Sequence, residues 1–211
     1  MRDTQVVSMI RARPAAAVTK ALYSTRYAMA LFRERGCRRV LDVGCGEAYL
    51  EKTEPERYVG LDIEHLRLSE ARGLGARNLV LGSAQHLPFR DEVFDGVLAK
   101  DVLEHFYLEE AFAFLHEVRR VLRRGGIFVV TTTRADQSFW DKPDHVRPYS
   151  NKWVRRVLTQ EMDAFEVLDA RELSAGIPGF GRLGLEPLAH ALANYLGIRV
   201  GHGIISLIRR V

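Results

Sequence analysis

Short apolar runs alternate with segments of helical spacing from residue 38 onward, and this alternation most limits how the chain can fold. Helical spacing predicts helices at 47–53, 64–74, 109–123 and 151–160. The apolar runs predict buried strands at 40–43, 58–62, 78–81, 94–99, 126–132, 165–168 and 203–208. The pattern is typical of an α/β fold in which helices cover both faces of a doubly wound, mostly parallel sheet. Such sheets bind ligands beyond the carboxyl ends of their strands.

Length and composition indicate one globular domain over residues 1–211. Of these residues, 47% are hydrophobic and 27% are charged, which is enough apolar surface for a full core without disulfides. We divide the domain into a basic N-terminal helical arm (1–37), a ligand-binding core (38–170), a cap-like insert (174–202) and a last strand (203–211).

The cysteines and the lengths of the apolar runs indicate the cellular compartment of the protein and argue against disulfides, a metal site and a membrane-spanning helix. Cys37 and Cys45 are the two cysteines, and no His or second Cys pair lies at metal-ligand spacing, so neither a disulfide framework nor a metal site is predicted. A reducing, cytoplasmic location fits this cysteine content. No apolar run reaches the roughly 18 residues that a membrane-spanning helix requires.

Positive charge is concentrated near the N-terminus. Residues 1–40 hold nine Lys or Arg side chains and two acids, whereas the rest of the chain holds 22 and 25. We therefore expect any peripheral contact with an anionic surface to involve residues 1–40. Nucleic acid is not favoured as a partner, because the chain has no aromatic-rich basic run and no recognised RNA-binding module. The sequence leaves the oligomeric state open.

Two glycines, Gly44 and Gly46, stand between a predicted strand and a predicted helix. Glycines in this place let the backbone turn sharply and lie against a ligand. A phosphate-binding P-loop would need Gly-Lys-Ser/Thr at the end of the turn, which is absent. A dinucleotide fingerprint would need its third glycine where Tyr49 stands. The alternative that fits is a nucleoside-bearing ligand without a phosphate.

The run Val-Leu-Asp-Val-Gly-Cys-Gly resembles the first motif of the class I, seven-stranded S-adenosylmethionine-dependent methyltransferases, an acidic residue followed by Gly-x-Gly-x-Gly. Asp42, Gly44 and Gly46 match the motif. Cys45 lies within it, and Ala48 replaces its last glycine, a small-for-small exchange expected to cost little. The resemblance covers the core and is strongest with the small-molecule, type 11-like branch. It implies S-adenosylmethionine as cofactor and a seven-stranded sheet whose last strand is antiparallel.

Two further segments resemble the same family. Asp62 ends the second strand, where the resemblance assigns it both ribose hydroxyls, and Ile63 follows it. The run Gly-Ser-Ala-Gln-His-Leu-Pro-Phe resembles the family's Gly-Asp-Ala-x-x-Leu-Pro-Phe. Ser83 stands where the family has an aspartate that accepts from the adenine amine, so its contact is uncharged. Ala84 and Gln85 complete this candidate adenine site.

The segment after the fourth strand carries the predicted chemistry. Lys100 and Asp101 are candidates for contacting the methionine part of the cofactor, and Asp101 also for a catalytic role. His105 is the candidate general base, because an imidazole can take a proton from a hydroxyl, a phenol or a carbon acid near neutral pH. A histidine that caps or packs against the next helix is the alternative interpretation.

A second cluster follows the fifth strand. The family often places a His, an Arg and an aromatic residue in the loop that faces the acceptor, and His145, Arg147 and Tyr149 occupy this part of the chain. Arg147 would fix a carboxylate or phosphate, and Tyr149 would stack or donate a hydrogen bond. The alternative is a loop that only tethers the next helix through charge pairs.

Together the motifs predict an S-adenosylmethionine-dependent methyltransferase acting on a small-molecule or lipid-like acceptor, with the O, N or C nucleophile left open. Two other hypotheses stay open. The excess of Lys and Arg over Asp and Glu suggests a methyltransferase that acts on RNA or protein. Its binding to RNA phosphates would weaken steeply as the salt concentration rises. A non-catalytic partner subunit would bind the cofactor and transfer nothing.

Overall fold

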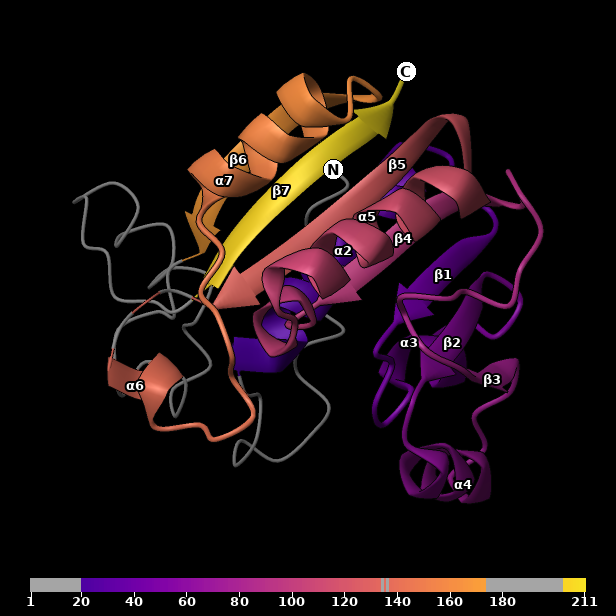
Figure 1. Ribbon diagram of the computed structural model, residues 1–211. Coiled ribbons are helices and arrows are strands. Elements are labelled where there is room, and N and C mark those ends of the chain that lie inside the picture. The colour runs from indigo at the N-terminus through magenta and orange to yellow at the C-terminus, as the bar shows by residue number, and fades with distance from the viewer. Residues whose placement is uncertain (1–19, 134, 136, 174–202) are drawn as a thin grey trace, which may run out of the picture.

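The computed structural model describes residues 20–133, 135, 137–173 and 203–211, which form a seven-stranded sheet with helices on both faces (Figure 1). The predicted insert and the first 19 residues of the predicted arm lie outside the described residues. No helix within the described ranges combines the length and the apolar character needed to cross a membrane.

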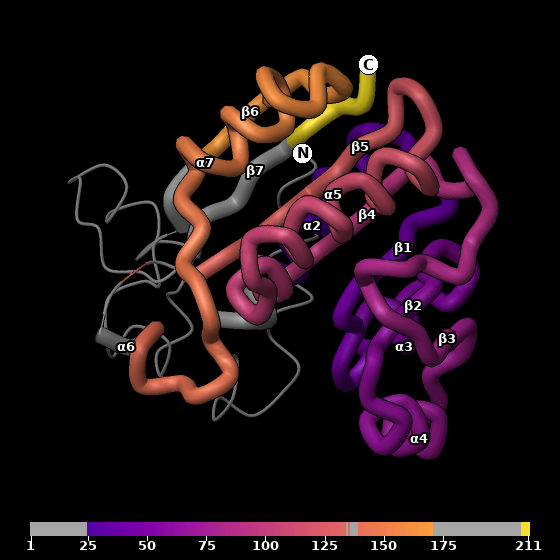
Figure 2. The backbone as a smooth tube through the Cα atoms, in the orientation of Figure 1, coloured from indigo at the N-terminus to yellow at the C-terminus, as the bar shows by residue number. Residues whose placement is uncertain are grey.

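The sheet has the predicted mostly parallel topology. Its spatial order is β3-β2-β1-β4-β5-β7-β6. Neighbours among β1 to β5, whose backbones lie side by side in Figure 2, are parallel. Strand β7 is antiparallel to both β5 and β6, between which it lies (Figure 1). The expectation of an antiparallel last strand is thus confirmed. The bounds are β1 Val40–Val43, β2 Tyr58–Asp62, β3 Leu79–Leu81, β4 Phe94–Lys100, β5 Leu122–Thr133, β6 Phe165–Leu173 and β7 Gly203–Arg210.

The helices agree with the predicted segments except near the candidate acceptor loop. The α-helices are α2 Lys20–Glu34, α3 Tyr49–Thr53, α4 His65–Gly73, α5 Leu108–Val121, α6 Gln137–Trp140 and α7 Asn151–Arg156. Ser150 caps α7 by accepting the Trp153 N–H at 3.2 Å. The predicted helix over 151–160 is confirmed, but its second half, Val157–Glu161, is π-helical. The short α6 and a 3₁₀ turn, Leu103–His105, carry no periodic pattern and were not predicted.

Adjacent strand residues point to opposite faces of the sheet, as the period of two requires. Leu41 packs in the same cluster as Phe114 of α5, on the face that α7 also covers. Val40 packs with Phe32 of α2 on the opposite face. In Figure 1, α5 lies in front of β4 and β5 and α2 lies behind them.

The strand order creates the crevice in which a ligand can bind. The chain moves from β1 outward to β2 and β3, and then returns to place β4 on the other side of β1. The connections on the two sides of β1 therefore diverge at the carboxyl ends of β1 and β4, as doubly wound sheets require.

We expect Gly60→Ala to lower the free energy of unfolding by about 1–3 kcal/mol. A Cβ at Gly60 would lie 2.8 Å from Cys45 Sγ, 2.8 Å from Glu51 Oε1 and 2.9 Å from Leu79 Cδ2. Urea denaturation measures this loss. Gly73→Ala, where a Cβ meets nothing within 4 Å, is the matched control and should be neutral or stabilising. Equal stability of Gly60→Ala and the wild type would contradict this packing.

Candidate active site

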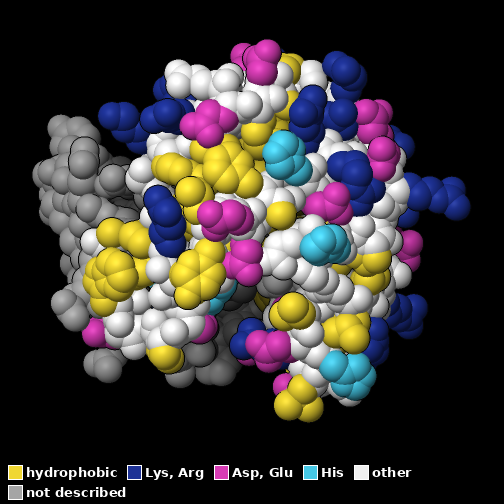
Figure 3. All heavy atoms as spheres, viewed as in Figure 1, with side chains coloured by type: hydrophobic (Ala, Val, Ile, Leu, Met, Phe, Trp, Pro, Cys, Tyr) yellow, Lys and Arg dark blue, Asp and Glu magenta, His cyan; other side chains and the backbone are white. Residues whose placement is uncertain are grey.

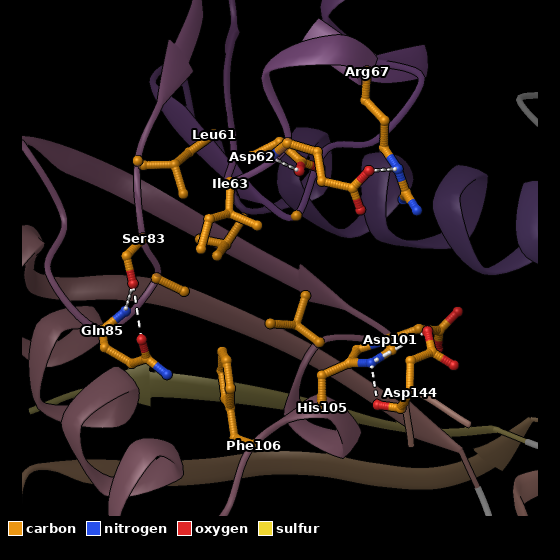
Figure 4. Close-up of a pocket in the computed structure, with 16 residues that line it drawn as sticks. Leu61, Asp62, Ile63, Arg67, Ser83, Gln85, Asp101, His105, Phe106 and Asp144 are labelled. Atoms are coloured by element: carbon orange, nitrogen blue, oxygen red, sulfur yellow. Dashed lines mark hydrogen bonds and ion pairs between the residues drawn. The ribbon is translucent and has the colours of Figure 1, made fainter. Parts of the chain in front are cut away.

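A cavity of about 370 Å³ opens at the carboxyl ends of the strands, within the size range of small-molecule sites. Figure 3 shows this face hollowed between α6 and α4. Figure 4 shows side chains from β2, the segment after β3, and the segments after β4 and β5 converging on the cavity. The lining residues are Val43, Gly44, Leu61, Asp62, Ile63, Glu64, Arg67, Gly82, Ser83, Ala84, Gln85, Asp101, Val102, His105, Phe106 and Asp144.

Main-chain hydrogen bonds hold the glycine turn against β2. The Leu61 carbonyl accepts the N–H groups of Gly44 at 2.7 Å and Cys45 at 3.0 Å. Gly44 and Gly46 have φ angles of +71° and +52°, in the left-handed region that favours glycine. Gly44 lines the cavity, whereas Gly46 does not, so the turn presents its first glycine to the ligand.

The Asp62 carboxylate connects the turn to the end of β2. Its Oδ2 accepts the Gly46 N–H and its Oδ1 accepts the Glu64 N–H, each at 2.9 Å. A carboxylate has about four lone-pair positions, so each oxygen retains one for a ligand hydroxyl. Asp62 therefore lies on the cavity wall with the capacity that a ribose diol would need.

Ala48, which replaces the last glycine of the Gly-x-Gly-x-Gly motif, has a strained backbone conformation. Its φ of 53° and ψ of 50° are left-handed, a conformation that costs an L-residue with a Cβ about 1–2 kcal/mol. The expectation of little cost is thus wrong. The methyl group is fully buried against Leu68 and Ala71 of α4, and this packing offsets part of the strain.

Two carboxylates are buried behind the turn and do not line the cavity. Glu51 is fully buried, and neither of its oxygens has a hydrogen-bond partner among the described residues. Burial raises the pKa of Glu51 to about 7. Burial, and then the neighbouring Glu51, raise the pKa of Asp42 well above its usual range, while Lys100 opposes the shift. Asp42 thus belongs to the support of the turn rather than to the cavity wall.

The end of β4 is fixed by polar contacts with β5. The Asp101 N–H donates to Thr131 Oγ1 at 3.1 Å, and that hydroxyl donates to Asp101 Oδ1 at 3.1 Å. Asp101 has a φ of 55°, which aspartate tolerates better than most residues. Lys100 Nζ lies 2.9 Å from Asp101 Oδ2. Asp101 lines the cavity, whereas Lys100 reaches it only through this ion pair.

His105 lies on the cavity wall beside Asp144, which the sequence analysis did not select. The His105 Nδ1 lies 2.9 Å from the Asp144 carbonyl oxygen and 3.6 Å from Asp144 Oδ2 (Figure 4). A carbonyl oxygen only accepts, so Nδ1 carries the proton and Nε2 is the basic nitrogen. The ring nitrogens and carboxylate of His105, Asp144 and His145 come within 4.8 Å of one another.

The loop after β5 differs most from expectation. The Tyr149 hydroxyl donates to the Phe106 carbonyl at 2.9 Å, and the Tyr149 ring is 1% exposed. Tyr149 thus lies in the core and not at the cavity wall, so its predicted stacking on an acceptor is not supported. Arg147 lies over this ring, with its Cζ 5.7 Å from the ring centroid. Neither Arg147 nor His145 lines the cavity, and their contact with an acceptor stays a prediction.

The candidate adenine wall combines one polar group with apolar surface. Ser83 Oγ donates to Gln85 Oε1 at 2.8 Å and accepts the Gln85 N–H at 3.2 Å. Ile63 is 70% exposed, an unusual state for a large apolar side chain that a stacked ring would relieve. The sequence analysis missed the Glu64–Arg67 pair on this wall, at 3.0 Å, because the i, i+3 spacing of charges is common on exposed helices.

Comparison with known proteins identifies the fold of the chain and a methyltransferase domain within it. A family model described as a methyltransferase domain matches residues 41–130. A methyltransferase from Archaeoglobus fulgidus has the same fold, with a TM-score of 0.66 and 22% identity over 90% of this chain and 93% of that one. A Mesorhizobium loti methyltransferase gives a TM-score of 0.65 and 19% identity over 88% and 96%.

Two curated mycobacterial proteins are similar in sequence. A fatty-acid O-methyltransferase of Mycolicibacterium smegmatis is 37% identical over 144 residues, which cover 64% of this chain and 50% of the relative. Phthiotriol/phenolphthiotriol dimycocerosates methyltransferase 1 of Mycobacterium ulcerans is 30% identical over 172 residues, covering 75% and 63%. The chain thus matches between half and two thirds of the length of these relatives.

Residues 41–130 therefore form a methyltransferase domain of the type 11 family, and the chain has the fold of the class I S-adenosylmethionine-dependent methyltransferases. Both solved structures are described as S-adenosylmethionine-dependent, and the cavity of this chain has groups that fit that cofactor. Asp62 offers free lone pairs to hydroxyls, Ile63 and Ala84 offer apolar surface to a purine, and Asp101 offers a carboxylate to a cationic group.

We expect Gly44→Ala to weaken S-adenosylmethionine binding at least about tenfold, a cost of about 1.4 kcal/mol. A Cβ at Gly44 would lie 2.8 Å from Val102 Cγ2, on the cavity wall, and the φ of +71° would be strained. Calorimetry measures the affinity. Gly36→Ala introduces the same backbone strain, at φ +70°, away from the cavity and should leave binding unchanged. Similar affinities for both variants would show that the turn does not hold the cofactor.

We expect the wild type to lose stability as pH rises from about 5 to 8, and Glu51→Gln to remove this loss. Because the pKa of Glu51 rises from 4.5 to about 7 on folding, the folded protein binds more protons than the unfolded chain between these values, and the wild type loses stability as pH rises through this window. The loss is up to about 3 kcal/mol. Denaturation at pH 5 and pH 8 should show the variant gaining on the wild type at the higher pH. The exposed control Glu56→Gln should show no such gain, and an equal gain there would contradict the assignment.

Proposed function

We propose that the protein transfers the methyl group of S-adenosylmethionine to a small, lipid-like acceptor. The observation that carries the proposal is that one cavity has Asp62 and Ile63, suited to a nucleoside, on one wall and the basic nitrogen-bearing ring of His105 on another. The names of the two mycobacterial relatives, which refer to a fatty acid and to dimycocerosates, support a lipid-like acceptor.

The bound cofactor supplies a methyl group that is electrophilic because it is attached to a sulfonium. Asp62 accepts the ribose hydroxyls with the lone pairs that Gly46 and Glu64 leave unused. Ser83 contacts the adenine amine. Asp101, held in place by Thr131, lies at the cavity wall with negative charge near the cationic methionine part.

His105 accepts the proton of a hydroxyl acceptor through Nε2. With the cofactor bound, the acceptor oxygen would take the methyl group, and the electron pair of the broken carbon–sulfur bond would stay on sulfur. The proton moves to His105 and the charges balance. A carboxylate acceptor already carries its nucleophilic electron pair, so its methylation needs no base and depends on position alone.

Several finer predictions belong to the same proposal. His145 and Arg147 would approach the acceptor from the loop after β5, and residues 1–40 would contact an anionic surface. A cytoplasmic location is supported by the two buried free thiols.

We expect His105→Ala to lower turnover of a long-chain alcohol at least about a hundredfold, the usual contribution of general base catalysis. Turnover of a fatty acid should fall less than threefold, and cofactor affinity should not change. Methyl transfer from radiolabelled cofactor and calorimetry measure these quantities. His116→Ala, on the exposed side of α5, is the matched control. Unchanged turnover of the alcohol would make His105 structural.

The same assay separates the other hypotheses. Transfer to RNA or to proteins of an extract, with no transfer to either lipid, would identify a macromolecular acceptor. Stoichiometric cofactor binding with no transfer to any acceptor would identify a non-catalytic subunit. Either result would overturn the proposal of a lipid-like acceptor.

A further inference from the structure

The loop after β5 is fastened to the 3₁₀ turn that carries His105. The Glu104 carbonyl accepts the N–H groups of Val146 at 2.8 Å and Arg147 at 3.2 Å. Glu104 itself is fully buried and cannot move without disturbing the core. These two bonds fix the main chain of the loop directly beside the residue that follows Glu104.

Asp144 meets His105 through both its main chain and its side chain. The carbonyl oxygen lies 2.9 Å from Nδ1, and the carboxylate Oδ2 lies 3.6 Å from the same nitrogen. The carbonyl fixes the proton on Nδ1, whereas the carboxylate adds negative charge next to the ring. Asp144 and His105 also line the same cavity (Figure 4).

We propose that Asp144 is a positioning residue for methyl transfer to a hydroxyl acceptor. Its carbonyl selects the tautomer in which Nε2 is basic, and its carboxylate stabilises the imidazolium that forms when His105 takes the acceptor proton. This inference rests on the proposed function, because it assigns Asp144 a role in the proton transfer at that site.

The charged and titratable groups around His105 are consistent with His105, and not His145, becoming the imidazolium. The His145 ring lies edge-on to His105, with 5.1 Å between ring centroids. Burial, and then Lys142 and His105, lower the pKa of His145, which favours its neutral form. Asp101 adds negative charge on the β4 side, and Lys142 opposes it from the loop. Burial, and then Asp101, raise the pKa of the buried Glu104 carboxyl group to about 7.

Asp144→Asn tests the carboxylate while keeping the carbonyl and the side-chain shape. Asp144 is 67% exposed at its side chain and His105 is 35% exposed, so we expect an effect of the size seen for solvent-exposed ion pairs. Turnover of a long-chain alcohol should fall roughly threefold to fivefold. The acid limb of its pH–rate profile should move to lower pH, because the imidazolium loses its neighbour. Turnover of a fatty acid and cofactor affinity should stay at wild-type values.

Two variants serve as controls. Asp144→Glu retains the charge and should restore the position of the acid limb. Glu109→Gln removes an exposed carboxylate from the first turn of α5 and should leave the profile unchanged. An unchanged acid limb and alcohol turnover in Asp144→Asn, with loss of turnover in His105→Ala, would overturn the role of Asp144 and leave the proposed function intact.

Nitrogen NMR of the imidazoles tests the inference independently of turnover, and thus separates its failure from failure of the proposed function. We expect the Nδ1–H tautomer for His105 in the wild type and a lower titration midpoint in Asp144→Asn. The Nε2–H tautomer, or an unchanged midpoint, would overturn the proposal. Loss of activity with a chelator and its recovery with Zn²⁺ would also overturn it, because Asp144 would then be a metal ligand.

Discussion

The attachment of the glycine turn to β2 is the interaction on which the site depends. The Leu61 carbonyl and the Asp62 carboxylate together accept N–H groups from three consecutive residues of the turn, Gly44 to Gly46. These bonds need a backbone that is left-handed at both glycines, and they place the turn between β1 and the cavity. We propose the same carboxylate as the group that holds ribose, so one side chain would serve both the support of the turn and the recognition of the ligand.

The opposite wall is built on a similar plan from residues distant in sequence. Asp101 is fixed to β5 through Thr131, and the 3₁₀ turn that follows it offers the Glu104 carbonyl to the loop after β5. Main-chain acceptors thus organise both walls. The side chains of Asp62 and His105 therefore line the cavity, while the main chain of neighbouring residues makes the hydrogen bonds that hold the two walls in place.

The sequence predicts an element or a site residue correctly where a short stretch of neighbouring residues determines it. Short apolar runs predicted all seven strands, although β5 begins at Leu122 instead of 126 and β6 ends at Leu173 instead of 168. The ends of β1, β2 and β4 place Gly44, Asp62 and Asp101 correctly because parallel strands share one carboxyl edge. Asp144 could not be predicted in this way, since its partner His105 lies 39 positions away and no spacing links them. Tyr149 was misplaced for a related reason: an aromatic residue in a loop has no pattern that distinguishes a core position from a ligand contact.

The position of β7 bears on how the protein is made. Among the described residues β6 pairs only with β7, although β6 precedes β7 by about 30 positions in the chain. During synthesis, β5 therefore emerges from the ribosome with one edge unpaired, and β6 follows it without a partner. Closure of the sheet waits for residues 203–210, and until then the nascent chain is exposed to wrong strand pairing and to chaperones.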